Sequence, residues 1–123
     1  MLINPNFAEA HNRLGVALWK TDRAQEAMAH WEWALRIKPD YEEAHNNLGT
    51  ALMQQHKLPE AIQHFEEAIR LSPDYAKAHY NLGNALEQEG KLKEAIGEYE
   101  QALRKDPGLA AARDDLARLQ AAR

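Results

Sequence analysis

The side chains best suited to chemistry in this 123-residue chain are its six histidines, because imidazole is a common zinc ligand and carries protons near neutral pH. Three of them, His11, His45 and His79, recur every 34 residues. If they stand on helices that pack side by side, adjacent copies lie about 10 Å apart, whereas zinc–nitrogen bonds are about 2 Å long. We therefore predict no metal site, and interpret these histidines as core-edge side chains with a polar tip.

The remaining histidines suggest no catalytic arrangement. His30 and His64 are predicted to be exposed, and His56 to lie in a turn. The sequence yields no nucleophile–base pair, glycine-rich phosphate loop or pair of catalytic carboxylates. The absence of cysteine excludes disulfides and thiolate sites. We expect a protein without catalytic residues or cofactors, and not an enzyme.

The composition indicates the fold class and excludes several kinds of partner. Apolar residues make up 45% of the chain, aromatic residues 7% and charged residues 28%, a mixture that favours helices. The net charge of −4 gives no basic surface for nucleic acid or anionic lipid. No apolar run reaches the roughly 18 residues of a membrane span, and MLINPNF is too short and polar for a secretory signal. We predict a cytoplasmic protein with no nucleic-acid partner and no membrane insertion.

The sequence repeats itself with a period of 34 residues. Residues 8–41, 42–75 and 76–109 align without a gap, and 17 of 34 positions are identical between neighbouring segments. The phrase AHNRLG, which ends at Gly15, returns as AHNNLG and AHYNLG. A fixed period of this length indicates a repeat protein.

Each segment is predicted to form two helices. In the second segment Ala44, Leu48 and Ala51 follow the i, i+4, i+7 spacing of a buried helical stripe. A second stripe centred on Phe65 ends before Pro73, which cannot continue a helix. Two helices joined by a short turn therefore fill the segment.

Helix starts are predicted from side-chain capping. Asp40 with Glu43, and Asn6 with Glu9, match the spacing of a capping box. Asp74 is expected to cap the helix that follows it.

The recurring glycines are predicted to allow close packing. Gly49 lies where the first helix of its segment approaches the second, and Ala61 faces it. A mid-helix glycine costs about 1 kcal/mol relative to alanine, so its recurrence implies a packing role. Phe65 is expected to fill the space beside Gly49, and Trp31 and Tyr99 the equivalent spaces.

These features resemble the tetratricopeptide repeat, a 34-residue helix–turn–helix unit. The resemblance implies an all-α, right-handed solenoid of three repeats, at residues 8–41, 42–75 and 76–109. Residues 1–7 resemble the remnant of a preceding repeat, and residues 110–123 a C-terminal capping helix.

The resemblance also implies that the first helices line a concave groove that binds a protein or peptide partner. The predicted contact residues in the groove are Asn12, Val16, Trp19, Glu43, Asn46, Asn47, Thr50, Met53, Lys77, Tyr80, Asn81 and Asn84. Its asparagines have two interpretations. Their amides either read a peptide backbone through donor and acceptor atoms, or are family consensus, solvated or bonded within the array.

Family members that grip chaperone C-termini use basic and amide side chains in this groove. Of the matching positions here only Asn47 and Lys77 fit, so a carboxylate clamp is not expected. We predict a non-catalytic interaction module. The alternatives are a self-assembling structural scaffold and the substrate-recruiting repeat region of a larger glycosyltransferase.

The N-terminal end is predicted to self-associate. No second helix precedes the first complete repeat, so its apolar face has no neighbour to pack against, and terminal repeats normally need a polar outer face. A second copy of the chain can cover it. The residues predicted in this homo-oligomer contact are Leu2, Ile3, Phe7, Leu14 and Trp33.

Overall fold

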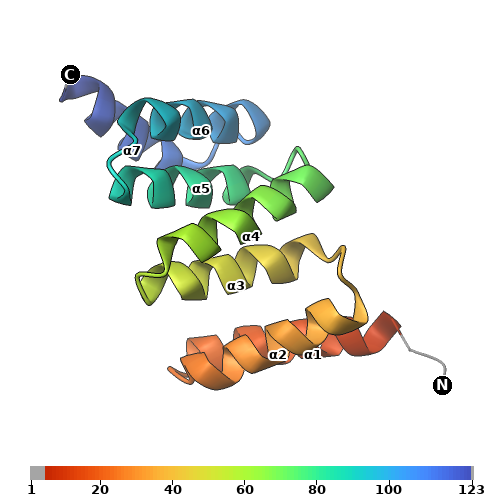
Figure 1. Cartoon of the computed structure of the whole chain (residues 1–123). Coiled ribbons are helices and arrows are strands. Elements are labelled where there is room, and N and C mark those ends of the chain that lie inside the picture. Colours follow the sequence, from red (N-terminus) through yellow and green to blue (C-terminus); the bar gives the residue numbers. More distant parts are fainter. Residues whose placement is uncertain (1–4, 123) are drawn as a thin grey trace.

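The computed structural model describes residues 5–122, where the chain forms helices joined by short turns. Its seven helices are α1 (Pro5–Lys20), α2 (Ala24–Ile37), α3 (Glu42–Gln54), α4 (Leu58–Leu71), α5 (Ala76–Gln88), α6 (Leu92–Lys105) and α7 (Ala110–Ala121). We call α1 with α2 the first unit, α3 with α4 the second and α5 with α6 the third. Figure 1 shows the units stacked in chain order, with α7 at the C-terminal end. The predicted all-α helical repeat solenoid is confirmed.

Within each unit a glycine of the first helix contacts an aromatic ring of the second. A Cβ atom built on Gly49 would lie 2.7 Å from the Phe65 ring, and one on Gly83 2.7 Å from the Tyr99 ring. Both rings are fully buried. Real Cβ atoms essentially never approach other atoms so closely, so only glycine fits beside the ring. The predicted role of these glycines is confirmed.

Neighbouring units are joined because each later first helix packs on the second helix before it: α3 on α2, α5 on α4, and α7 on α6. Leu48 and Leu82, on α3 and α5, are each only 5% exposed. Leu14 holds the equivalent place on α1 and is 46% exposed. One core cluster extends from Leu18 to Leu119, so the units share a core.

The turn between the two helices of each unit contains one residue with a left-handed backbone. These residues are Asp22, His56 and Gly90, with φ values of 66°, 61° and 82°. A Cβ on Gly90 would meet nothing within 4 Å, so this glycine serves the backbone angle alone. Asp22 and His56 adopt the same angle at some cost in strain.

All three capping predictions are wrong, and those for α3 and α5 miss by one residue. The N-cap of α3 is Tyr41, whose carbonyl accepts the His45 amide at 3.2 Å, and it makes no side-chain capping bond. Tyr75 likewise precedes α5, and the Asp74 carboxylate instead pairs with Lys105 at 3.2 Å. α1 already begins at Pro5, so Asn6 lies inside it and cannot be its cap. The capping-box spacing was present at Asp40 and Glu43, but α3 and α5 start where the carbonyls of Tyr41 and Tyr75 accept the first helical bond.

Gly49→Ala is expected to lower the free energy of unfolding by about 1–3 kcal/mol, because the added methyl overlaps the buried Phe65 ring. Gly97→Ala is the matched control. Gly97 lies within α6 and its Cβ would meet nothing within 4 Å, so better helix propensity should raise stability by about 0.5–1 kcal/mol. Urea unfolding measures both. A Gly49→Ala protein as stable as the Gly97→Ala protein would contradict the packing.

Candidate interaction face

The predicted contact residues all lie on the first helices of the three units. Glu43 and Lys77 are exposed, whereas Asn12 and Asn46 are buried. The remaining residues are partly exposed: Val16, Trp19, Asn47, Thr50, Met53, Tyr80, Asn81 and Asn84. We call these twelve residues, with Asp115 and Arg118 of α7, the candidate face. Asp115 and Arg118 follow Asn81 and Asn84 by one 34-residue period, so α7 continues the repeat positions of the first helices.

Side-chain hydrogen bonds connect the first helices along the candidate face. Asn47 Nδ2 donates to Asn12 Oδ1 at 3.0 Å, and Asn81 Nδ2 donates to Asn46 Oδ1 at 2.9 Å. We call these two bonds the amide ladder. They join residues 35 apart, so each one links a first helix to the next. The asparagines recur at least in part because they bond within the array.

The buried ends of the amide ladder have further partners. Asn12 Nδ2 donates to Glu43 at 3.4 Å, and Asn46 Nδ2 donates to the Tyr75 hydroxyl at 3.3 Å. Among the described residues, no buried side-chain nitrogen or oxygen lacks a partner. The ladder therefore satisfies its buried amides, as a stable polar network inside a protein requires.

The outer ends of the ladder keep free acceptor atoms. Asn47 and Asn81 are partly exposed and donate through Nδ2. The bonds of the described chain do not engage their side-chain oxygens. Each oxygen can therefore accept a hydrogen bond from a partner's backbone amide. The two interpretations of the asparagines are thus compatible, with the nitrogen serving the array and the oxygen facing outward.

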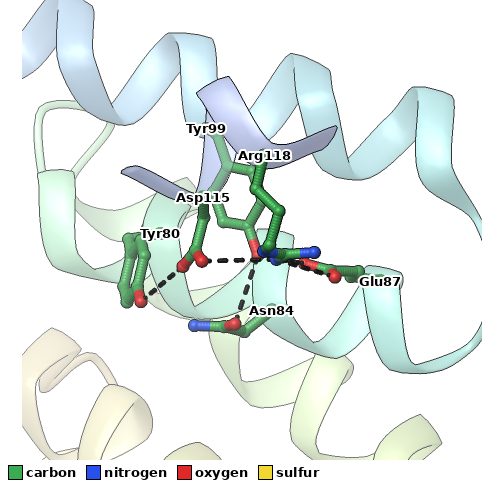
Figure 2. Close-up of polar contacts among 6 residues, drawn as sticks. All are labelled: Tyr80, Asn84, Glu87, Tyr99, Asp115 and Arg118. Carbon is green, nitrogen blue, oxygen red and sulfur yellow. Dashed lines mark hydrogen bonds and ion pairs between the residues drawn. The ribbon is translucent and has the colours of Figure 1, made fainter. Parts of the chain in front are cut away.

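At the C-terminal end of the candidate face a charged network ties α7 to the third unit (Figure 2). Tyr80 donates to Asp115 at 2.8 Å, and Arg118 bonds both Glu87 at 2.8 Å and Asp115 at 3.2 Å. Tyr99 lies on α6, and its hydroxyl donates to Glu87 at 2.9 Å. The Tyr80–Asp115 bond spans 35 residues, as the amide ladder does, so it continues the ladder with different chemistry.

The pKa values of Tyr99 and Glu87 in this network are shifted in opposite directions. Burial, and then the hydrogen bond to Glu87, raise the pKa of Tyr99. The hydrogen bond from Arg118 lowers the pKa of Glu87 despite its partial burial. Near neutral pH the phenol is thus a neutral donor and the carboxylate an anion.

This network was not predicted from the sequence. Tyr99 was predicted only as the ring beside Gly83, in the place of Trp31 and Phe65. Of those three rings, only that of tyrosine carries a hydroxyl, and only the fold shows that it reaches Glu87. The useful signal was the 34-residue period, which places Asp115 and Arg118 in register with residues of the predicted groove.

The prediction that His30 and His64 are exposed is wrong. Both are partly buried and pair with histidines of the first helices: His11 Nδ1 lies 2.9 Å from His30 Nδ1, and His45 Nδ1 lies 3.0 Å from His64 Nδ1. A single-helix pattern cannot show a partner 19 residues away on the next helix. Residues 5–122 contain no group of three or more potential metal ligands.

The N-terminal face carries exposed apolar side chains. Phe7 is 59% exposed, Leu14 46% and Trp33 50%. The Trp33 ring stacks on His11 at 6.1 Å between centroids, and the Arg36 guanidinium lies 4.9 Å over it. The other predicted contact residues, Leu2 and Ile3, lie outside the described residues.

Asn46→Ala is expected to lower the free energy of unfolding by about 1–3 kcal/mol, because Asn81 and Tyr75 both lose a buried partner. Gln63→Ala, at an exposed position of α4, is the control and should change stability by less than about 0.5 kcal/mol. In a double-mutant cycle with Asn81→Ala, the double mutant should lose less stability than the sum of the two single losses, because each single change already removes the shared bond. Additive losses would show that the amide ladder contributes nothing to stability.

Comparison with known proteins identifies the repeat. A family model described as "Tetratricopeptide repeat" matches residues 46–110, and one described as "TPR repeat" matches residues 23–56. A search of curated proteins found no match. None of the described helices combines the length and apolar character needed to cross a bilayer.

Solved structures share the fold. The first TPR of Spaghetti (RPAP3) bound to HSP90 peptide SRMEEVD has a TM-score of 0.92 at 23% identity, over 98% of this chain and 95% of that one. The Arabidopsis OM64 TPR domain has a TM-score of 0.92 at 21% identity, over 97% and 98%. MamA has a TM-score of 0.85 at 26% identity, over 94% of this chain and 68% of its own.

Proposed function

The chain belongs to the tetratricopeptide repeat family, and from that premise we propose that it is a non-catalytic module that binds a peptide or protein segment along the candidate face. The observation that carries this proposal is the pair of outward amide oxygens on Asn47 and Asn81. They occupy equivalent positions on neighbouring units, and their orientation is set by the bonds that their nitrogens make. Such fixed acceptors suit the backbone of an extended segment.

Charge along the candidate face adds a second element of recognition. Glu43 and Lys77 are exposed on α3 and α5, so a partner meets an acidic group beside one unit and a basic group beside the next. Glu43 accepts one long bond, from Asn12 at 3.4 Å, whereas Asp115 and Arg118 are held by shorter bonds to Tyr80, to Glu87 and to each other. We therefore expect the partner to contact mainly the first helices of the second and third units.

A related fold binds the acidic peptide SRMEEVD, but this chain is not suited to a carboxylate clamp. Asn12 is buried and bonded to Asn47, and Val16 offers no charge. Lys77 is the single basic residue among the positions that correspond to a carboxylate clamp, which are Asn12, Val16, Asn47, Lys77 and Asn81. SRMEEVD is therefore expected to bind weakly or not at all, and serves as a negative control peptide.

The test uses peptides selected on the chain from a random display library. Glu43→Arg with Lys77→Glu reverses the charge order of the candidate face and should weaken the selected peptides roughly tenfold. Glu66→Arg with Lys93→Glu is the matched control, because it reverses exposed charges on the second helices and also preserves net charge. Isothermal titration calorimetry measures both. Equal affinities of the two variants would contradict binding along the candidate face.

The exposed N-terminal face supports a second candidate function, self-association. Each of α2, α4 and α6 already carries a following helix, α3, α5 or α7. No second helix of the described chain is therefore left to cover Leu14. A second copy placed face to face about a two-fold axis offers a surface of the same kind, with Phe7, Leu14 and Trp33 in contact.

Leu14→Glu is expected to abolish this dimer while the helical content is retained. Leu92→Glu is the matched control, because Leu92 is similarly exposed, at 49% compared with 46% for Leu14, but lies on α6. Sedimentation over a hundredfold concentration range measures the state of association. A parent protein that is monomeric throughout would contradict self-association.

A further inference from the structure

The histidine pair of the second unit is built around one hydrogen. His45 Nε2 lies 2.9 Å from the carbonyl oxygen of Pro39, and its Nδ1 lies 3.0 Å from His64 Nδ1. Because a carbonyl oxygen only accepts, Nε2 of His45 must carry hydrogen. In the neutral ring Nδ1 of His45 is then bare, so His64 must donate its Nδ1 hydrogen to it.

The geometry leaves no room for a second proton between the rings. The ring centroids are 5.2 Å apart, well beyond the 3.0 Å between the nitrogens, so the rings meet at those two atoms. If both rings become imidazolium, two N–H groups and two positive charges face each other at that distance. The hydrogen bond is then lost and replaced by repulsion.

The third unit has the opposite requirement. His79 occupies the place of His45, and its Nε2 lies 3.0 Å from the carbonyl oxygen of Pro73. Its Nδ1 lies 2.8 Å from the Glu98 carboxylate, which stands in the place of His64. Both partners accept, so the protonated imidazolium satisfies both. One chain thus contains two versions of the same helix-to-helix contact with opposite requirements for hydrogen.

The charges around His64 come mainly from its own helix. Glu60 and Glu67 on α4 and His45 on α3 act on it, and Arg70 binds Glu67. These groups lie on α3 and α4, the two helices of the second unit. Burial, followed by His45, lowers the pKa of His64 below its ordinary value of 6.5. The unfolded chain therefore takes up this proton first, so the stability is complete above about pH 6.5 and declines below it.

We propose that the His45–His64 pair is an acid-sensitive clasp between α3 and α4, closed by one shared hydrogen and opened when both rings are protonated. The His79–Glu98 pair keeps α5 and α6 together under the same conditions. Mild acid therefore loosens the second unit before the third. The His11–His30 pair, with nitrogens 2.9 Å apart, belongs to the same class in the first unit.

The test compares melting temperatures at pH 7.5 and pH 5.5 in the full chain. His64→Glu gives the second unit the arrangement of the third, and should reduce the acid-induced fall in melting temperature by about 3 °C or more relative to the parent. His56→Glu is the matched control, because it makes the same substitution in an exposed turn and should leave the fall unchanged. The His11–His30 pair is present in the parent and in both variants, so its contribution to the acid-induced fall cancels when the three proteins are compared.

The reverse substitution keeps the proposal testable if His64→Glu fails to fold. Glu98→His places a second histidine pair in the third unit and should enlarge the acid-induced fall. Nitrogen NMR of the imidazoles should show a single hydrogen shared by Nδ1 of His45 and Nδ1 of His64 at pH 7.5. Falls of equal size in the parent, His64→Glu and Glu98→His proteins would overturn the proposal. Two fully protonated rings still in contact at pH 5.5 would overturn it as well.

Discussion

The contact on which the rest of the structure depends is the one between a glycine and an aromatic ring inside each unit. The ring lies where a Cβ atom of Gly15, Gly49 or Gly83 would stand, 2.5–2.7 Å from its nearest atom. This contact sets how closely the two helices of a unit approach each other. Because all three units use it, their apolar faces have the same shape, and each first helix fits the second helix before it. The core cluster that runs from Leu18 to Leu119 across all three units follows from this repetition.

Polar contacts on this common frame distinguish one unit from another. The amide ladder and the Tyr80–Asp115 bond occupy the same repeat positions, but they change from amide pairs in the first two steps to a phenol and a carboxylate in the last. The helix-to-helix contact changes from histidine pairs to histidine with glutamate. A repeated backbone therefore allows single substitutions to give each unit its own polar contacts without altering the fold.

The period, the two-helix unit and the glycine–ring contact could be predicted from sequence, because they depend on residue size and spacing within one segment. Contacts between helices could not be predicted so well. The His45–His64 pair requires knowing how far α4 is rotated against α3, and the Tyr99 network requires knowing where α7 lies. The capping predictions failed for a different reason. Asp40 has the right spacing, but the Tyr41 carbonyl takes the first helical bond. The groove residues were placed from family resemblance, and only the structure showed that Asn12 and Asn46 are buried.

We propose that the array uses its amide nitrogens to hold itself together and its amide oxygens to bind a partner. NMR of the side-chain amides of Asn47 and Asn81, recorded while a selected peptide is titrated into the chain, tests this directly. Both amide groups are expected to shift on binding, and their hydrogens are expected to stay protected from exchange, because the bonds to Asn12 and Asn46 remain. Shifts confined to α2, α4 and α6, with the two asparagines unmoved, would contradict it.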